Sequence, residues 1–231
     1  EDARLKRPFC YKGRPYMRVE SVTTTMPQTT YNELLLQRDG ARFRWEQFGN
    51  SDLTLQDIDG NEVLKTVRLG IECGRMPEDT GNDVPVIMEK FGLMRDGILN
   101  HAAAVLFGKH ENMEYPQCLL RLARFRGTDK AVFMDNQRIH GNFFQLLNAA
   151  MAFIFKHLSL SGTTDTLERE EHLTIPYKAI REGVLNSLAH RSYRDAGGSV
   201  SIAIYDNRVE IENPGSFPPN WDVEKMKSEQ E

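Results

Sequence analysis

The spacing of hydrophobic positions predicts a chain in which helices alternate with short strands. In several segments apolar residues recur every three or four positions, which lines up one face of an α-helix. Helices are predicted on this basis over residues 61–73, 86–91, 101–107 and 142–158. Two more are expected, over residues 29–38 with Thr29 or Thr30 as the cap, and from Pro176 at the first helical position to about His190.

Alternating apolar residues bounded by turn residues predict the strands. These are a hairpin over residues 8–20, strands over residues 43–48, 118–125, 131–139 and 167–175, and a pair carrying Val200, Ile202 and Ile204, then Val209 and Ile211. Asp206 and Asn207 provide the tight turn of that last pair. We therefore expect an α/β (α+β) fold of mixed sheets with helices packed on one face.

Composition narrows the function classes without choosing among them. The chain has 231 residues, 40% of them hydrophobic and 27% charged, and a net charge of −4. These values are typical of a globular protein and give no overall nucleic-acid signature, so any such contact would be a local patch. No apolar run approaches the ~20 residues of a membrane helix, and the charged start lacks the apolar core of a signal peptide.

The cysteines indicate the cellular compartment, and the first residue indicates a fragment. Cys10, Cys73 and Cys118 are scattered and odd in number, which fits reduced thiols and a cytoplasmic protein. The chain starts without Met, so we expect a fragment excised from a longer protein.

One helical stripe carries the most distinctive chemistry. Glu182, Asn186 and His190 recur every fourth residue, which places a carboxylate, an amide and an imidazole on one side of the last predicted helix. Asn186 can offer an amide oxygen to Mg²⁺, and Glu182 can orient or deprotonate water. His190 can face phosphate. The alternative interpretation is a solvated helix face without a ligand.

Other patterns leave two interpretations open. One predicted strand and its turn carry a cluster of basic residues: Arg121, Arg124, Arg126 and Lys130. The cluster either contacts phosphate or forms a charged strand edge that discourages aggregation. The basic amino terminus contacts nucleic acid or is simply solvated. Residues 86–97 form a degenerate helix-turn-helix or a plain helical connector. No phosphate-binding Gly-x4-Gly-Lys-Ser/Thr loop of a translocating motor occurs in the sequence.

Two motifs in the carboxyl-terminal third carry a family resemblance. They are Ile175-Pro-Tyr-x-Ala-Ile-Arg-Glu-x-Val-x-Asn-x-Leu-Ala-His-Arg and Ile204-Tyr-Asp-x-Arg-x-Glu-Ile-x-Asn-Pro-Gly215. They resemble bacterial proteins labelled RecG-like ATP-dependent helicases or transcriptional regulators. Such proteins join an AlbA-like (Schlafen-type) domain, assigned to DNA binding, to a histidine-kinase/gyrase-type (GHKL) ATPase-like domain. Upstream, residues 8–21, 90–108 and 124–130 resemble further parts of the same family.

The resemblance implies roles for individual residues. Glu182 matches the acid of the family's N-box, Asn186 its Mg²⁺ ligand, and His190 the residue that closes the box. The family's Asp-x-Gly-x-Gly, whose Asp reads the adenine, is replaced here by Glu212-Asn213-Pro214-Gly215-Ser216. Glu212 or Asn213 would then substitute on the adenine side, beside Gly215, although Pro214 removes a donor and stiffens the loop. The family's Arg-Gly-Ser-Gly segment, its candidate phosphate lid, does not occur in the sequence.

The resemblance also implies an organisation and a function. Residues 1–50 would be the end of an AlbA-like domain, residues 51–160 a middle α/β domain, and residues 161–231 the first part of a GHKL-like domain. We expect a cytoplasmic bacterial DNA-binding regulator whose ATPase-like domain binds ATP and Mg²⁺ as a switch. Whether it is an enzyme is left open, and if catalysis occurs it is slow ATP hydrolysis with Glu182 orienting the water. The competing hypothesis is a degenerate ATPase fold that serves as a dimerisation or interaction scaffold. Homodimerisation is left open.

Overall fold

The computed structural model describes residues 8, 10–19, 21–39, 45–109, 111, 115–158, 160–163, 170–173 and 175–215. The chain divides into two compact units, Glu1–Phe48 and Gly49–Glu231. Each is described by itself. No helix among the described residues is both long enough and apolar enough to cross a membrane.

The first unit contains a small antiparallel sheet and a helix. Its elements are β1 (Cys10–Tyr11), β2 (Arg14–Val19), β3 (Val22–Thr25), α1 (Gln28–Asp39) and a short 3-10 helix, η2 (Trp45–Gln47). The predicted hairpin is confirmed, and Lys12 and Gly13 turn it with positive φ angles of 49° and 76°. The predicted helix is confirmed too, but it starts at Gln28, so Thr29 and Thr30 lie inside it and are not its cap.

The strand predicted over residues 43–48 is wrong where the structure describes it. Residues 45–47 form η2, and the N–H of Phe48 donates to the carbonyl of Trp45 at 3.1 Å. The apolar alternation was real, but a strand also needs a hydrogen-bonded neighbour. The backbone next pairs only at Gly49, in an isolated bridge to Asn100.

A helical part opens the second unit. Its elements are η3 (Leu55–Asp57), α2 (Gly60–Glu72), η4 (Glu78–Thr80), α3 (Val84–Lys90), β4 (Met94–Arg95), β5 (Ile98–Leu99) and α4 (His101–Phe107). The three predicted helices are confirmed. Asp59 caps α2 by accepting from two backbone N–H groups, and Asn100 caps α4 by accepting from Ala103 at 3.0 Å.

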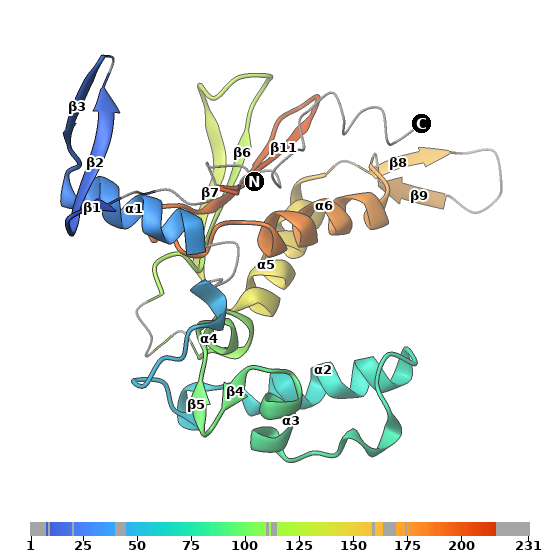
Figure 1. Ribbon diagram of the computed structural model, residues 1–231. Coiled ribbons are helices and arrows are strands. Elements are labelled where there is room, and N and C mark those ends of the chain that lie inside the picture. The colour runs from blue at the N-terminus through green and yellow to red at the C-terminus, as the bar shows by residue number, and fades with distance from the viewer. Residues whose placement is uncertain are drawn as a thin grey trace. The chain divides into compact units, whose positions relative to one another are not determined.

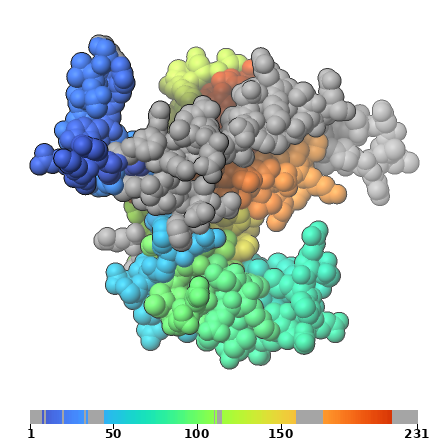
Figure 2. Space-filling view, viewed as in Figure 1, coloured from blue at the N-terminus to red at the C-terminus, as the bar shows by residue number. Residues whose placement is uncertain are grey.

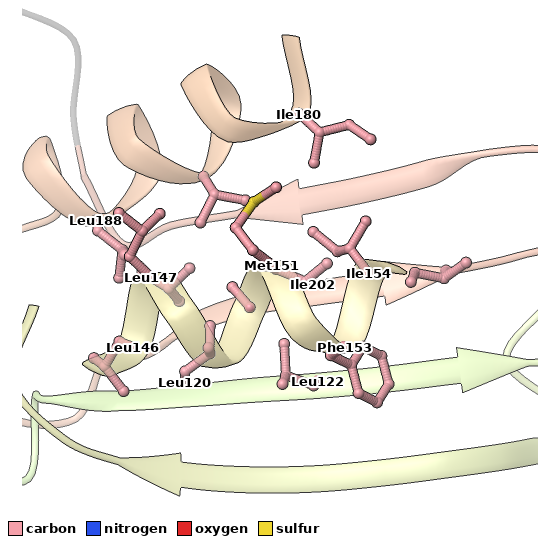
Figure 3. Close-up of a cluster of buried hydrophobic side chains, with 14 residues drawn as sticks. Leu120, Leu122, Leu146, Leu147, Met151, Phe153, Ile154, Ile180, Leu188 and Ile202 are labelled. Atoms are coloured by element: carbon pink, nitrogen blue, oxygen red, sulfur yellow. The ribbon is translucent and has the colours of Figure 1, made fainter. Parts of the chain in front are cut away.

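The rest of the second unit is a layered α/β arrangement (Figure 1). A four-stranded sheet runs in the order β11-β10-β6-β7, with β6 (Leu119–Phe125), β7 (Phe133–His140), β10 (Val200–Ile204) and β11 (Val209–Glu212). β10 is parallel to β6, and the other neighbours are antiparallel. Helices α5 (Phe143–His157) and α6 (Tyr177–Ala189) pack on one face (Figure 3). The predicted α/β class is confirmed.

The connections around α6 differ from the prediction in detail. A separate hairpin, β8 (Leu160–Thr163) and β9 (Glu170–Leu173), precedes α6, and residues 167–169 and 174 of the predicted strand lie outside the described residues. Pro176 is the N-cap of α6 with an extended ψ of 131°, so it precedes the first helical position instead of occupying it.

The core lies between the sheet and the two helices (Figure 3). It is made of Leu120, Leu122, Leu146, Leu147, Ala150, Met151, Phe153, Ile154, Ile180, Val184, Leu188, Val200, Ile202 and Ile204. The alternation of β6 and β10 places one set of side chains in this core and the other set on the opposite face. Gly183 lets α6 approach β11, since a Cβ there would lie 3.3 Å from Cδ1 of Ile211.

The four-stranded sheet contains strands from both sides of the domain boundary expected between residues 160 and 161. Strands β6 and β7 come from one side, and β10 and β11 come from the other. The division into domains 1–50, 51–160 and 161–231 stays a prediction. Elements β6, β7, α5, α6, β10 and β11 share one core.

Candidate functional site

Helix α6 presents the predicted polar stripe. Its buried side carries Ile180, Val184, Ser187 and Leu188. Glu182, Asn186 and His190 are exposed on the other side. Nδ2 of Asn186 donates to Oε1 of Glu182 at 3.3 Å, so the amide and the carboxylate are adjacent. His190 is the C-cap, and its backbone N–H donates to the carbonyl of Asn186 at 2.9 Å.

The loop after β11 is fixed to the carboxyl-terminal end of α6. Nδ2 of Asn213 donates to the carbonyl of Ser187 at 3.2 Å, and Oδ1 of Asn213 accepts from the N–H of Gly215 at 2.9 Å. Gly215 lies against the backbone of His190, where a Cβ would come well inside 3.0 Å of the carbonyl oxygen. Residues more than twenty positions apart are thereby held together.

A buried arginine, Arg191, holds the backbone that follows the carboxyl-terminal end of α6. Arg191 is only 4% exposed and donates to the carbonyl oxygens of Gln117 and, at 2.9 Å, Gly198. Pro214 packs over Gly198 so closely that a Cβ on that glycine would lie 2.7 Å from the ring. Burial lowers the pKa of Arg191, while Tyr193, with its ring centroid 4.8 Å from the guanidinium, acts in the opposite direction. The sequence gives no signal for this role, because an arginine after a helix end is ordinarily on the surface.

Glu212 is placed away from the stripe. It pairs with Ser201 across β10 and β11, and cross-strand partners share a face of the sheet. Ser201 alternates with the core residues Val200 and Ile202, so Glu212 is on the face opposite α6. Its carboxylate accepts from Oγ of Ser201 at 3.2 Å. The structure thus brings Asn213 and Gly215 to α6, but not Glu212.

The donor set fits a partly hydrated Mg²⁺ ion and no all-protein metal cage. Among the described residues, no three His, Cys, Asp or Glu side chains are grouped so that they could hold a metal. Mg²⁺ usually keeps several waters and takes one or two protein oxygens beside phosphate oxygens. Oδ1 of Asn186 can be one of these protein oxygens, because it accepts no hydrogen bond from any described residue.

A separate cavity of about 450 Å³ lies at the turn between β10 and β11 and is lined by none of the six predicted site residues. Arg124 on its wall donates to Asp206 at 2.6 Å, which together with the N–H of Gly127 lowers the pKa of the Asp206 carboxyl. His157 also lines it and contacts Asp135 at 2.8 Å. Hydrogen bonds from Lys156 and His157 lower the pKa of Asp135 to about 2.

Comparisons with known proteins bear on the fold and on the carboxyl-terminal segment. Residues 197–231 match the HATPase-type family model described as "Putative ATP-dependent DNA helicase recG C-terminal". The structure is similar to the crystal structure of the DIP2311 protein from Corynebacterium diphtheriae, with a TM-score of 0.62 and 14% identity. That similarity covers 94% of this chain and 42% of DIP2311, so the chain spans less than half of that protein. No curated protein sequence matches the chain.

The match supports an ATPase-like segment at the carboxyl end of the chain. It includes β10, β11 and the loop with Asn213 and Gly215, while α6 lies outside it. Similarity to DIP2311 shows the fold alone at this level of identity.

Proposed function

We propose that the second unit contains an ATPase-like Mg²⁺-nucleotide site, formed by the polar stripe of α6 and the loop after β11. The observation that carries this proposal is the fixation of that loop to α6 through Asn213 and Gly215. The loop belongs to the segment similar to the RecG carboxyl-terminal family, and the helix carries the carboxylate and amide that Mg²⁺-nucleotide chemistry requires. The whole protein would be a bacterial DNA-binding regulator that uses this site as a switch.

The proposal gives each residue a separate task. Asn186 holds Mg²⁺ through Oδ1, and the ion neutralises charge on the phosphates when it is bound. Glu182 orients the attacking water and accepts its proton, for slow hydrolysis. His190 and the N–H groups near Gly215 face phosphate. Asn213 and Glu212 remain adenine-side candidates. The side-chain amide of Asn213 already donates to Ser187, and an adenine would have to extend around the edge strand β11 to contact Glu212.

A second candidate is the non-enzymatic scaffold. Both polar groups of the Asn213 side chain are already hydrogen-bonded within the chain, and Pro214 is packed against Gly198. These contacts favour a loop that stabilises the fold instead of opening for a ligand. In that case the Glu182–Asn186 pair is a solvated face of α6.

Nucleotide titration of matched variants distinguishes the two candidates. We expect a fluorescent ATP analogue to bind wild type in the presence of Mg²⁺. Asn186→Ala should bind at least about tenfold more weakly, because losing even a partner of a metal ligand costs that much and Asn186 is a direct ligand. Glu182→Gln should retain binding and lose hydrolysis. Asn61→Ala, an exposed asparagine at the start of α2, is the control and should behave as wild type. Absence of binding by wild type would reject the nucleotide site and leave the scaffold.

A further inference from the structure

The sheet has a second face, opposite α5 and α6, whose composition the proposed nucleotide site does not explain. Arg121 and Ala123 of β6 alternate with the core residues Leu120 and Leu122, so they point to this face. Their partners on β7 are Arg138 and Asn136. Apart from Ala123, the face is therefore lined by polar and cationic side chains where the middles of β6 and β7 pair.

Two arginines lie directly opposite each other there. Arg121 pairs with Arg138, both are exposed, and neither forms an ion pair or side-chain hydrogen bond with another described residue. His140, two positions after Arg138, is exposed on the same side. Like charges at directly opposite positions destabilise a sheet. This arrangement costs stability unless an anion binds between the two guanidinium groups.

Aromatic side chains lie further along the same face. Phe125 pairs with Phe133 at the end of β6, with ring centroids 4.5 Å apart, and Phe125 also stacks on Tyr205 at 5.2 Å. Phe125 is buried, but Phe133 is 57% exposed and neighbours Met134 at 55%. An exposed ring supported from behind is a platform on which a base can stack.

The acidic residues of this face are at its other edge and already have partners. Glu212 accepts from Ser201, and Glu210 accepts from Arg208 at 2.7 Å and from Tyr205 at 3.2 Å. Both are on β11, separated from β6 by β10. Strands β6 and β7 therefore carry arginines and no acid on this face, and their turn adds the exposed Arg126 and Lys130 beside one acid, Asp129, which accepts from the N–H of Ala131.

We propose that Arg121, Arg138, His140, Asn136 and Phe133, here called the β6–β7 face, bind single-stranded nucleic acid. The arginines and His140 contact the phosphates, Asn136 contacts base edges, and Phe133 stacks on a base. The tip of the β6–β7 hairpin, in yellow-green, is at the molecular surface (Figure 2). From Phe133 to Arg138 the strand rises by roughly 16 Å, enough for an extended nucleic-acid backbone to follow. This inference does not rest on the proposed nucleotide site, whose polar stripe on α6 is on the other side of the sheet.

Single strands fit better than duplex DNA or an acidic protein segment. Duplex bases are stacked on each other and cannot stack on Phe133, whereas unpaired bases can. An acidic peptide would satisfy the arginines but would leave the exposed aromatic ring without a planar partner. Phosphate charge and stacking together explain both halves of the face.

The test is fluorescence anisotropy of a labelled 20-mer of thymidine, titrated with the full chain over a series of salt concentrations. We expect binding at low salt with a negative salt slope. In Arg121→Gln/Arg138→Gln the slope should fall by about 1.4, since each phosphate contact on a single strand contributes about 0.7. Phe133→Ala should weaken binding about tenfold and leave the slope unchanged.

Matched variants keep the test specific. Arg68→Gln/Arg95→Gln removes the same charge from exposed positions on α2 and the β4–β5 hairpin, and Leu69→Ala shortens an exposed side chain of α2. Both should bind as wild type. The Arg121/Arg138 variant should be at least as heat-stable as wild type, because a like-charge pair is removed.

Four results would overturn the proposal. The first is that wild type does not bind the labelled 20-mer, and the second is that the two double-arginine variants lose affinity equally. The third is that duplex DNA binds as tightly as the single strand, and the fourth is that polyglutamate competes as well as the unlabelled thymidine 20-mer. The last outcome would assign the face to an acidic protein partner.

Discussion

Replacing Gly215 by alanine should displace the loop after β11 from α6 and weaken nucleotide binding. The added Cβ would lie well inside 3.0 Å of the carbonyl oxygen of His190 and 2.9 Å from Oδ1 of Asn213. A normal C···O contact needs about 3.3 Å, so the loop must move by roughly 1 Å. Because the obstacle is backbone at a helix end, the helix cannot yield easily. A displacement of that size can cost about a hundredfold in a positioned site.

The assay for Gly215→Ala combines Mg²⁺-dependent ATP binding with thermal unfolding. Overpacking should cost about 1–3 kcal/mol, and each kcal/mol lowers Tm by roughly 2–4 °C in a chain of this size. Gly197→Ala is the matched control, since its Cβ would make an ordinary 3.4 Å contact with Asp195. Unfolding of Gly215→Ala at the wild-type temperature, together with nucleotide binding as tight as that of Gly197→Ala, would refute this prediction.

Three further predictions concern the described fold. Asp135→Asn should lower stability at neutral pH, and the difference should disappear in acid urea titrations as the pH falls through about 2, because the pKa of Asp135 is depressed to that value in the folded state. Arg191→Met should cost about 1–3 kcal/mol in urea unfolding, since buried carbonyl oxygens lose their donors; an unchanged midpoint would contradict the proposed fixation. In thiol titration of the folded protein, the exposed Cys10 and Cys73 should react rapidly, while Cys118, whose pKa burial raises to about 12, should react only on unfolding.

Periodicity predicted the elements whose burial is one-sided. Helix α5 and strand β10 both bury their large apolar residues mainly on one side, so the spacing of those residues and the local caps determined the element. Strand β3 was missed because its four residues are all exposed and carry no apolar alternation. The two-residue strands β4 and β5 are too short for any periodic pattern. Strands of this kind are specified by their neighbours in space.

The candidate site was predictable only where its residues share a helix. The spacing of Glu182, Asn186 and His190 is a local property, and the structure places them on the exposed side of α6 as expected. Contacts between the loop and the helix are not local: Asn213 reaches Ser187, and Arg191 reaches Gln117 across more than seventy positions. Sequence spacing carries no information about such contacts. It also could not show that Glu212 points to the opposite face, since that depends on the register with Ser201.

Hydrogen–deuterium exchange with Mg²⁺-ATP tests the proposed nucleotide site most directly. Compared with ATP plus chelator, we predict slower exchange confined to the carboxyl-terminal half of α6 and to the backbone N–H groups of Asn213 and Gly215. The same experiment on Asn186→Ala should show no protection. Protection at the cavity lined by Arg124 and Arg208 instead, or none anywhere in wild type, would contradict the account.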